Sequence, residues 1–234
     1  MNEVLQLAGG VQIPILYEDR AVLAIDKPAG WMLAPGEWRH TGRNLQVALE
    51  AALAERPFWV RRRNLRFLRY VHRLDAETTG VLLLVRSRGA LEAYSALFES
   101  RQVEKRYLAV VQGRPPKPQW TSRGKLAPET GVPGRMRVHA SGKEAETRFA
   151  VLRASAQNTG ALIEAHPITG RTHQIRVHLA EAGLPVIGDK LYGGPPNRQL
   201  ALRAVGLAYF DPFRGKRVNI RAPEEAFLRQ FGFW

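Results

Sequence analysis

The stretch from Val81 to Val85 is a run of consecutive apolar residues, and it constrains the fold of this chain more than any other feature. A run of this kind, without polar alternation, is typical of a strand that is buried on both faces. The residues that follow recur with the spacing of one helix face: Leu91, Tyr94, Leu97 and Phe98. We therefore predict a buried strand followed by an amphipathic helix.

The rest of the chain combines short strands with a few helices. Extended segments are predicted over Ile15–Tyr17, Ala21–Ile25, Tyr107–Val111, Thr147–Leu152, Ala161–Ala165 and Leu200–Tyr209. Helices are predicted after an N-cap at Asn44, over Arg171–Glu181 and over Glu224–Phe231. The order lacks the regular alternation of a doubly wound sheet, and no linker divides the 234 residues, so we expect one α+β domain over residues 1–234.

The charge balance points to a polyanionic partner. The chain has 35 basic and 21 acidic residues, which gives a formal net charge of +14. Each phosphate that Lys or Arg neutralises releases condensed counterions, so nucleic acid is the leading candidate. An arginine-rich surface without a specific partner is the alternative that composition alone leaves open.

Several classes of chemistry lose support from what the sequence lacks. It has no cysteine, which removes disulfides, thiolate metal sites and cysteine nucleophiles. It has no phosphate-binding loop, dinucleotide-binding glycine motif or serine nucleophile elbow, and its six histidines have no metal-ligand spacing. We expect no metal and no cofactor. The start resembles no signal peptide and no run could span a membrane, so we expect a cytoplasmic protein and, by default, a monomer.

Asp75 lies between an arginine-rich segment and the buried run at Val81. Six arginines occur between Arg61 and Arg73, close in sequence to this carboxylate. A carboxylate in this position would stay ionised and could act as a nucleophile or general base. An Asp that caps a turn or pairs with Arg73 is the ordinary alternative, and a ligand of a metal-dependent nuclease is a third.

Five segments, in order along the chain, resemble one family. The segment His72-Arg73-Leu74-Asp75-Ala76-Glu77-Thr78-Thr79-Gly80 is similar to the signature of the RluA-type RNA pseudouridine synthases, with Thr79 in place of Ser. The other four similar segments are Ile25–Gly30, Glu104–Val111, Thr169–Leu179 and Pro185–Gly193. The resemblance covers roughly residues 15–223, so we expect the chain to be a single catalytic domain without the additional N-terminal RNA-binding domain of many members. It implies a pseudouridine synthase fold: a mostly antiparallel mixed sheet with flanking helices and a basic active-site cleft.

The resemblance also implies roles for individual residues. Asp75 would be the nucleophile, Tyr107 would line the uracil pocket and is the candidate for removing the C5 proton, and Arg176 matches the arginine that pairs with the catalytic carboxylate. Arg171 is its nearest competitor for that role. The target nucleotide must be flipped out of its stack, and Arg73 is the candidate for filling the vacated place.

The partner that we expect is structured RNA, either ribosomal RNA or transfer RNA. The predicted RNA-binding residues are His72, Arg73, Lys105, Arg171 and the cluster Arg61, Arg62 and Arg63. For the whole cluster from Arg61 to Arg69, a solvated, charged loop is an equal alternative to RNA contact. The alternative class of function is a protein that binds RNA without catalysis.

Overall fold

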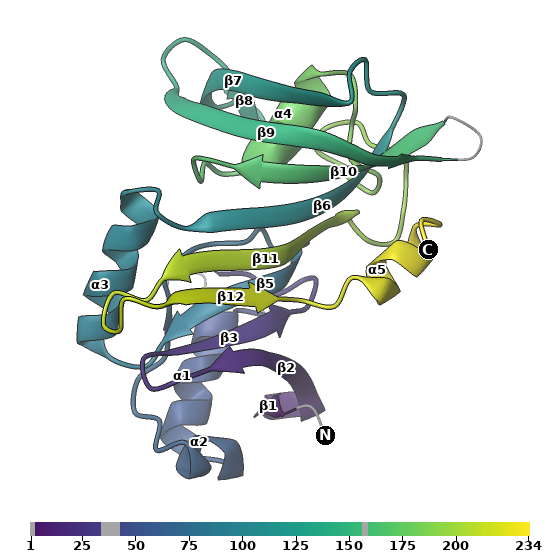
Figure 1. Ribbon diagram of the computed structural model, residues 1–234. Helices are drawn as coiled ribbons and strands as arrows, with labels where there is room; N and C mark the ends of the chain where they lie inside the picture. Colours follow the sequence, from purple (N-terminus) through teal and green to yellow (C-terminus); the bar gives the residue numbers. More distant parts are fainter. Residues whose placement is uncertain (1–2, 34–42, 156–158) are drawn as a thin grey trace. The chain divides into compact units, whose positions relative to one another are not determined.

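The computed structural model describes residues 3–33, 43–155 and 159–234, and these form two compact units (Figure 1). The first unit comprises Met1–Val103 and Gly206–Ala222, and the second comprises Glu104–Val205 and Pro223–Trp234. Neither unit is continuous in sequence. Strand β11 (Leu202–Phe210) crosses the boundary between them along the chain.

The first unit is built on an antiparallel sheet. Its strands are β1 (Val4–Leu7), β2 (Val11–Glu18), β3 (Val22–Lys27), β4 (Arg69–Tyr70), β5 (Thr79–Val85) and β12 (Arg217–Arg221), together with the end of β11. A short 3₁₀ turn over Ala8–Gly10 connects β1 to β2. β2 pairs with β3, β3 with β5, β4 with β5, and β11 with β12, in every case antiparallel.

The apolar run at Val81 forms β5, as predicted. In the register with β3, Val22 lies opposite Val85 and Lys27 lies opposite Gly80. The residues of β5 from Val81 onwards are almost fully buried. α3 (Arg88–Glu99) follows with Ser87 as its N-cap, and its Tyr94 is fully buried in the same core. The predicted strand and helix are both confirmed.

Two further helices of the first unit lie between β3 and β4. α1 (Leu45–Glu55) begins after Asn44, whose side-chain oxygen accepts hydrogen bonds from the backbone N–H groups of Gln46 and Val47. This confirms the predicted N-cap, which satisfies donors that the first helical turn leaves unpaired. α2 (Phe58–Arg62) starts after Pro57 and carries the first arginines of the cluster.

The second unit is an antiparallel sheet with the strand order β6-β10-β9-β7-β8. Its strands are β6 (Glu104–Gln112), β7 (Gln119–Pro128), β8 (Met136–Val138), β9 (Lys143–Ala154) and β10 (Gly160–Pro167). α4 (Gln174–Glu181) packs against β9 and β10, behind the strands in Figure 1, and α5 (Glu225–Gln230) follows Pro223.

One expectation about this unit needs correction, and two of its strands were not predicted. The helix predicted over Arg171–Glu181 begins only at Gln174, because His173 adopts a left-handed backbone with φ of 55° and acts as the N-cap residue. The two strands that were not predicted are β7 and β8. In the described part of the chain no helix is long and apolar enough to cross a membrane.

Candidate active site

Asp75 lies in the tight turn that leads into β5. The turn is closed by a hydrogen bond of 3.1 Å from the Thr78 N–H to the Asp75 carbonyl. The Asp75 side chain is half-buried, whereas its neighbour Leu74 is buried in the unit. The turn is thus anchored on one side by an apolar contact and continues directly into the most buried strand of the unit.

Lys27 holds this turn from the end of β3. Its side chain is fully buried, and its Nζ donates to the carbonyl oxygens of Pro28, Ala76 and Thr78 at 3.0, 2.9 and 2.9 Å. An ammonium has three donors, so these three carbonyls satisfy the whole group. The Gly30 N–H donates to the same Ala76 carbonyl at 2.8 Å. The residues on both sides of the turn are therefore tied to the end of β3.

Burial lowers the pKa of Lys27 to about 8, and the negative charges of Glu77 and Asp75 act in the opposite direction. The amine is still mainly protonated at neutral pH. Its ammonium group is bonded to two carbonyls of the turn that carries Asp75. The sequence contains Lys27 in a segment of the family pattern, but nothing in its position along the chain indicated this role.

The two residues that precede Leu74 differ in their surroundings. His72 Nε2 accepts a hydrogen bond of 3.0 Å from the Leu83 N–H, and its ring stacks on Phe98 with centroids 4.8 Å apart. Because Nε2 is an acceptor, the imidazole is neutral with its proton on Nδ1. This arrangement fits a role in fixing the chain on β5. Arg73, in contrast, is exposed.

In the second unit, Tyr107 lies on β6 opposite Ala165 of β10 and is 8% exposed. A tyrosine at this place presents an apolar ring with a polar end, which suits a pocket for a flat heterocycle. Lys105, two residues earlier, donates from Nζ to the Thr169 carbonyl at 2.9 Å. Lys105 thus ties β6 to the segment that precedes α4.

Arg176 projects from α4 into a buried ion pair. Its Nε and Nη2 donate to the two carboxylate oxygens of Asp189 at 2.6 and 2.8 Å. The side chains are almost fully buried, with exposures of 7% for Arg176 and 0% for Asp189. A bidentate pair of this kind fixes the plane of the guanidinium as well as its position. Asp189 is a residue whose role the sequence reasoning missed.

Asp189 is itself fixed by its backbone surroundings. Its Oδ1 also accepts from the N–H groups of Leu191 and Tyr192 at 3.1 and 3.3 Å. The preceding Gly188 has φ of +81°, and a Cβ there would lie 2.1 Å from the Gln199 carbonyl oxygen. Only glycine fits this turn. The Gly-Asp pair of the sequence is therefore explained by the need to place one carboxylate.

Tyr192 lies beside the ion pair and connects it to two other segments. Its ring lies 5.1 Å from the Arg176 guanidinium carbon, in a cation–π contact. Its hydroxyl accepts from the Met136 N–H at 2.9 Å and lies 2.9 Å from His173 Nδ1. The guanidinium of Arg176 is thus held by both a carboxylate and an aromatic face.

The remaining predicted RNA-binding residues divide into bound and exposed groups. The Arg63 side chain is 7% exposed and is bound by Glu3 and Glu18, so it stabilises the first unit. Arg62 is 57% exposed, although it pairs with Glu3, and Arg61 is also exposed. Arg171 Nε donates to the Glu144 carbonyl. Of the cluster, Arg61 and Arg62 have the exposure that RNA contact needs.

Residues 21–181 match the family model described as RNA pseudouridylate synthase, which spans most of the chain and covers Asp75, Tyr107 and Arg176. A ribosomal large subunit pseudouridine synthase C from Vibrio cholerae is 37% identical over 229 residues, covering 92% of this chain and 67% of that protein. The protein of the same name from Escherichia coli is 34% identical, covering 97% of this chain and 71% of that one.

Solved structures support the fold. A human protein, RNA pseudouridylate synthase domain containing 1, has a TM-score of 0.74 at 24% identity and covers 95% of this chain and 87% of that chain. The chain therefore belongs to the RNA pseudouridylate synthase family. It is an isomerase that converts uridine in RNA to pseudouridine. The alternative of a non-catalytic RNA-binding protein is not favoured.

Proposed function

We propose that this enzyme modifies uridine in ribosomal RNA with Asp75 as its nucleophile. The observation that carries the proposal is the turn at Asp75, which Lys27 holds through three carbonyls and which continues into β5. A nucleophile must be placed within narrow limits, and a turn anchored in this way supports such placement. The ribosomal target rests on the names of the relatives. Transfer RNA is the alternative target.

The reaction breaks the bond between N1 of uracil and C1′ of ribose, turns the base and joins C5 to C1′. Asp75 attacks the sugar or removes a sugar proton, and either route needs its carboxylate ionised. Tyr107 lines the pocket for the uracil ring and takes the C5 proton. Arg176 is the third catalytic residue, with its guanidinium oriented by Asp189. These roles come from family resemblance, supported by the burial of Tyr107 and by the ion pair that orients Arg176.

The two units together form one catalytic domain in this proposal. Both are discontinuous in sequence, and the family match over residues 21–181 includes parts of each. Contacts with RNA are assigned to Arg61, Arg62 and Arg73, whose side chains are exposed. We also propose that the enzyme acts as a cytoplasmic monomer. It needs no metal or cofactor in this proposal, because the isomerisation neither oxidises nor hydrolyses its substrate.

The experiment is site-resolved mapping of pseudouridine in total RNA from cells with and without the gene. We expect one or a few pseudouridines in large-subunit ribosomal RNA to disappear and to return with the wild-type chain. Loss of a site in transfer RNA instead would replace the ribosomal target by the alternative. An unchanged map would contradict the proposed activity in those cells.

A further inference from the structure

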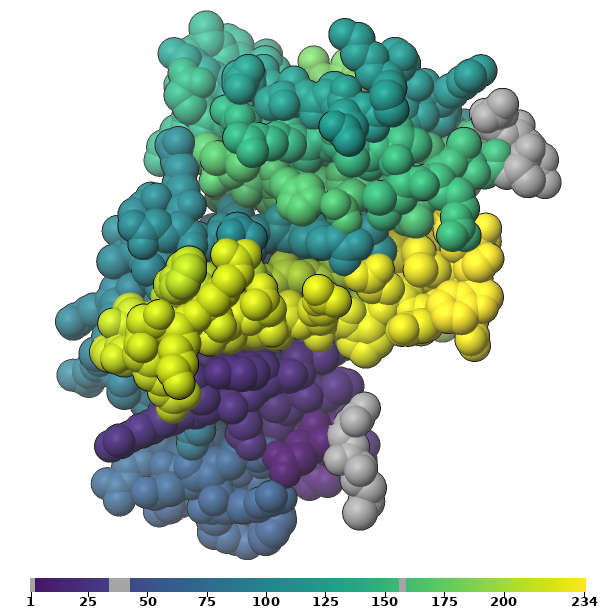
Figure 2. Space-filling model, in the orientation of Figure 1, coloured from purple at the N-terminus to yellow at the C-terminus, as the bar shows by residue number. Residues whose placement is uncertain are grey.

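The hairpin formed by β11 and β12 has one buried face and one exposed face. On the buried face, Leu207 lies opposite Ile220 and Tyr209 opposite Val218. The exposed face carries the pairs Phe210 with Arg217, Ala208 with Asn219, and Gly206 with Arg221. β12 contributes three exposed polar side chains to this face, whereas Gly206 and Ala208 add almost no bulk beside them. The segment lies on the face turned to the viewer in Figure 2.

The loop of this hairpin is held in one conformation by Asp211. The carboxylate is 2% exposed, and its Oδ1 accepts from the N–H groups of Phe213 and Arg214 at 2.8 and 3.0 Å. The backbone of Asp211 also exchanges hydrogen bonds with Lys216 and Gly215, both at 2.8 Å. The loop therefore presents its side chains from a fixed backbone.

Two aromatic rings are exposed on this fixed frame. Phe210 is 58% exposed and Phe213 is 59% exposed. The Arg217 guanidinium carbon lies 5.9 Å from the centre of the Phe210 ring. Exposed phenylalanines are costly in water, and rings held beside guanidiniums are the arrangement on which proteins stack unpaired bases.

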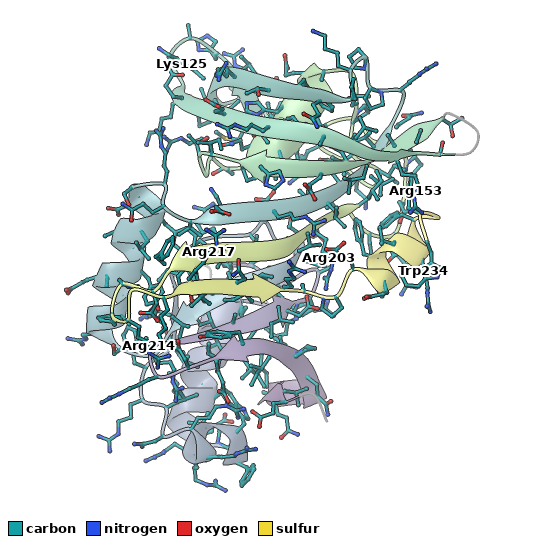
Figure 3. The ribbon with its side chains drawn as sticks, viewed as in Figure 1. Lys125, Arg153, Arg203, Arg214, Arg217 and Trp234 are labelled. Carbon is teal, nitrogen blue, oxygen red and sulfur yellow. The ribbon has the colours of Figure 1, made fainter. Side chains whose placement is uncertain are left out.

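The exposed charged residues of this hairpin are all basic. Arg214, Lys216, Arg217 and Arg221 are all exposed, and Figure 3 labels Arg214 and Arg217 on this hairpin. The acidic Asp19 near the loop is 8% exposed, and its Oδ1 accepts from the N–H groups of Ala21 and Val22. Arg214 approaches Asp19 at 3.7 Å and is still 51% exposed. The positive charge of these exposed side chains is complementary to a phosphate backbone and not to an apolar protein surface.

We propose that the β11–β12 hairpin binds a single-stranded segment of the RNA substrate. Bases stack on Phe210 and Phe213, and Arg214, Lys216 and Arg217 contact the phosphates. This inference rests on the proposed function insofar as RNA is the substrate. It adds a second contact, carried by a part of the chain far in sequence from the Asp75 turn. Its role is to hold RNA that flanks the target.

The test measures binding of a labelled oligoadenylate of about 12 nucleotides to the full chain by fluorescence anisotropy. This probe has no uridine, so it reports contacts outside the reaction itself. We expect the variant with Phe210→Ala and Phe213→Ala to bind about tenfold more weakly, because each stacked base contributes measurably to affinity. Arg217→Gln should reduce the slope of log Kd against log salt by about 0.7.

The matched control is Trp234→Ala, which removes a ring that is 64% exposed and lies over Arg229. It should bind like the wild type. Wild-type affinity in the double variant, or an equal loss in Trp234→Ala, would overturn the assignment to the hairpin. If the hairpin binds a protein instead, the double variant should keep the wild-type affinity for the oligoadenylate. Pseudouridine formation is measured separately, so failure of the proposed activity would not be mistaken for failure of this contact.

Discussion

Replacing Lys27 by methionine should displace Asp75 and lower kcat strongly, while it changes the free energy of unfolding of the first unit only modestly. Methionine has nearly the length of lysine but neither charge nor donors. The carbonyl oxygens of Pro28 and Thr78 lose the Nζ donor, whereas the Ala76 carbonyl keeps its hydrogen bond from Gly30. The turn that carries Asp75 then loses the side-chain ties to the end of β3 and keeps the hydrogen bond from Gly30.

The two energetic effects of this substitution oppose each other. A buried carbonyl that loses its donor costs about 1 to 3 kcal/mol, so the two carbonyls together cost about 2 to 6 kcal/mol. Burial lowers the pKa of Lys27 from 10.5 to about 8, which corresponds to about 3 kcal/mol that methionine does not incur. The free energy of unfolding should therefore fall by no more than about 3 kcal/mol. A displacement of about 1 Å at Asp75 lowers kcat on the order of 100-fold.

The pH dependence gives an independent check on Lys27. Between pH 8 and 10.5 the folded chain has released this proton whereas the unfolded chain still binds it. A rise in pH through this window therefore favours the folded state, by up to about 3 kcal/mol from this group. Lys27→Met should lose this contribution, so that the stability advantage of the wild type over the variant grows from pH 8 to 10.5.

The assay combines urea unfolding with single-turnover pseudouridine formation. Lys117→Met is the matched control, because Lys117 is exposed in a proline-rich loop, and it should leave both quantities unchanged. Wild-type kcat in folded Lys27→Met would refute the argument that this lysine positions the nucleophile.

Three other substitutions test the second unit. Tyr107→Phe keeps the ring but removes the hydroxyl, so kcat should fall at least on the order of 100-fold with unchanged RNA affinity. An unaffected kcat would rule out proton transfer by this hydroxyl. Asp189→Asn leaves Arg176 without its buried carboxylate partner, so the free energy of unfolding in urea should fall by about 3 to 5 kcal/mol, and a loss below about 1 kcal/mol would count against the pair. Burial lowers the pKa of His178 from 6.5 to about 4. As the pH falls from 6.5 to 4, the unfolded chain binds a proton at this residue before the folded chain does. The free energy of unfolding should therefore fall by up to about 3 kcal/mol over this range. His178→Gln should flatten that acid limb, and an unaltered limb would contradict the assignment.

The fold was predictable where one face of an element is clearly apolar. Val81–Val85 and the helix after Asn44 have strong patterns, and both were confirmed. β7 was missed because most of its side chains are at least partly exposed and only Leu126 is fully buried. Its strand structure depends on pairing with β9, which is distant in sequence. β12 was missed for the same reason, since arginines occupy both its ends.

The site was predictable only in part. Family resemblance pointed to Asp75, Tyr107 and Arg176, and their roles stay predictions. Lys27 and Asp189 lie in segments that match the family pattern, yet their functions arise from contacts over long sequence separations. The Lys27 amine donates to the carbonyls of Ala76 and Thr78, which lie 49 and 51 positions later in the sequence. No local pattern reveals that a lysine at the end of a strand will be fully buried.

The most direct test of the account replaces Asp75 by asparagine and measures pseudouridine formation in a single turnover on the mapped RNA. Glu77→Gln is the control, since it removes a carboxylate from the same turn at an exposed position. We expect Asp75→Asn to fold, to bind RNA with unchanged affinity and to form no pseudouridine, whereas Glu77→Gln should remain active. Pseudouridine formation at the wild-type rate by Asp75→Asn would contradict the central claim.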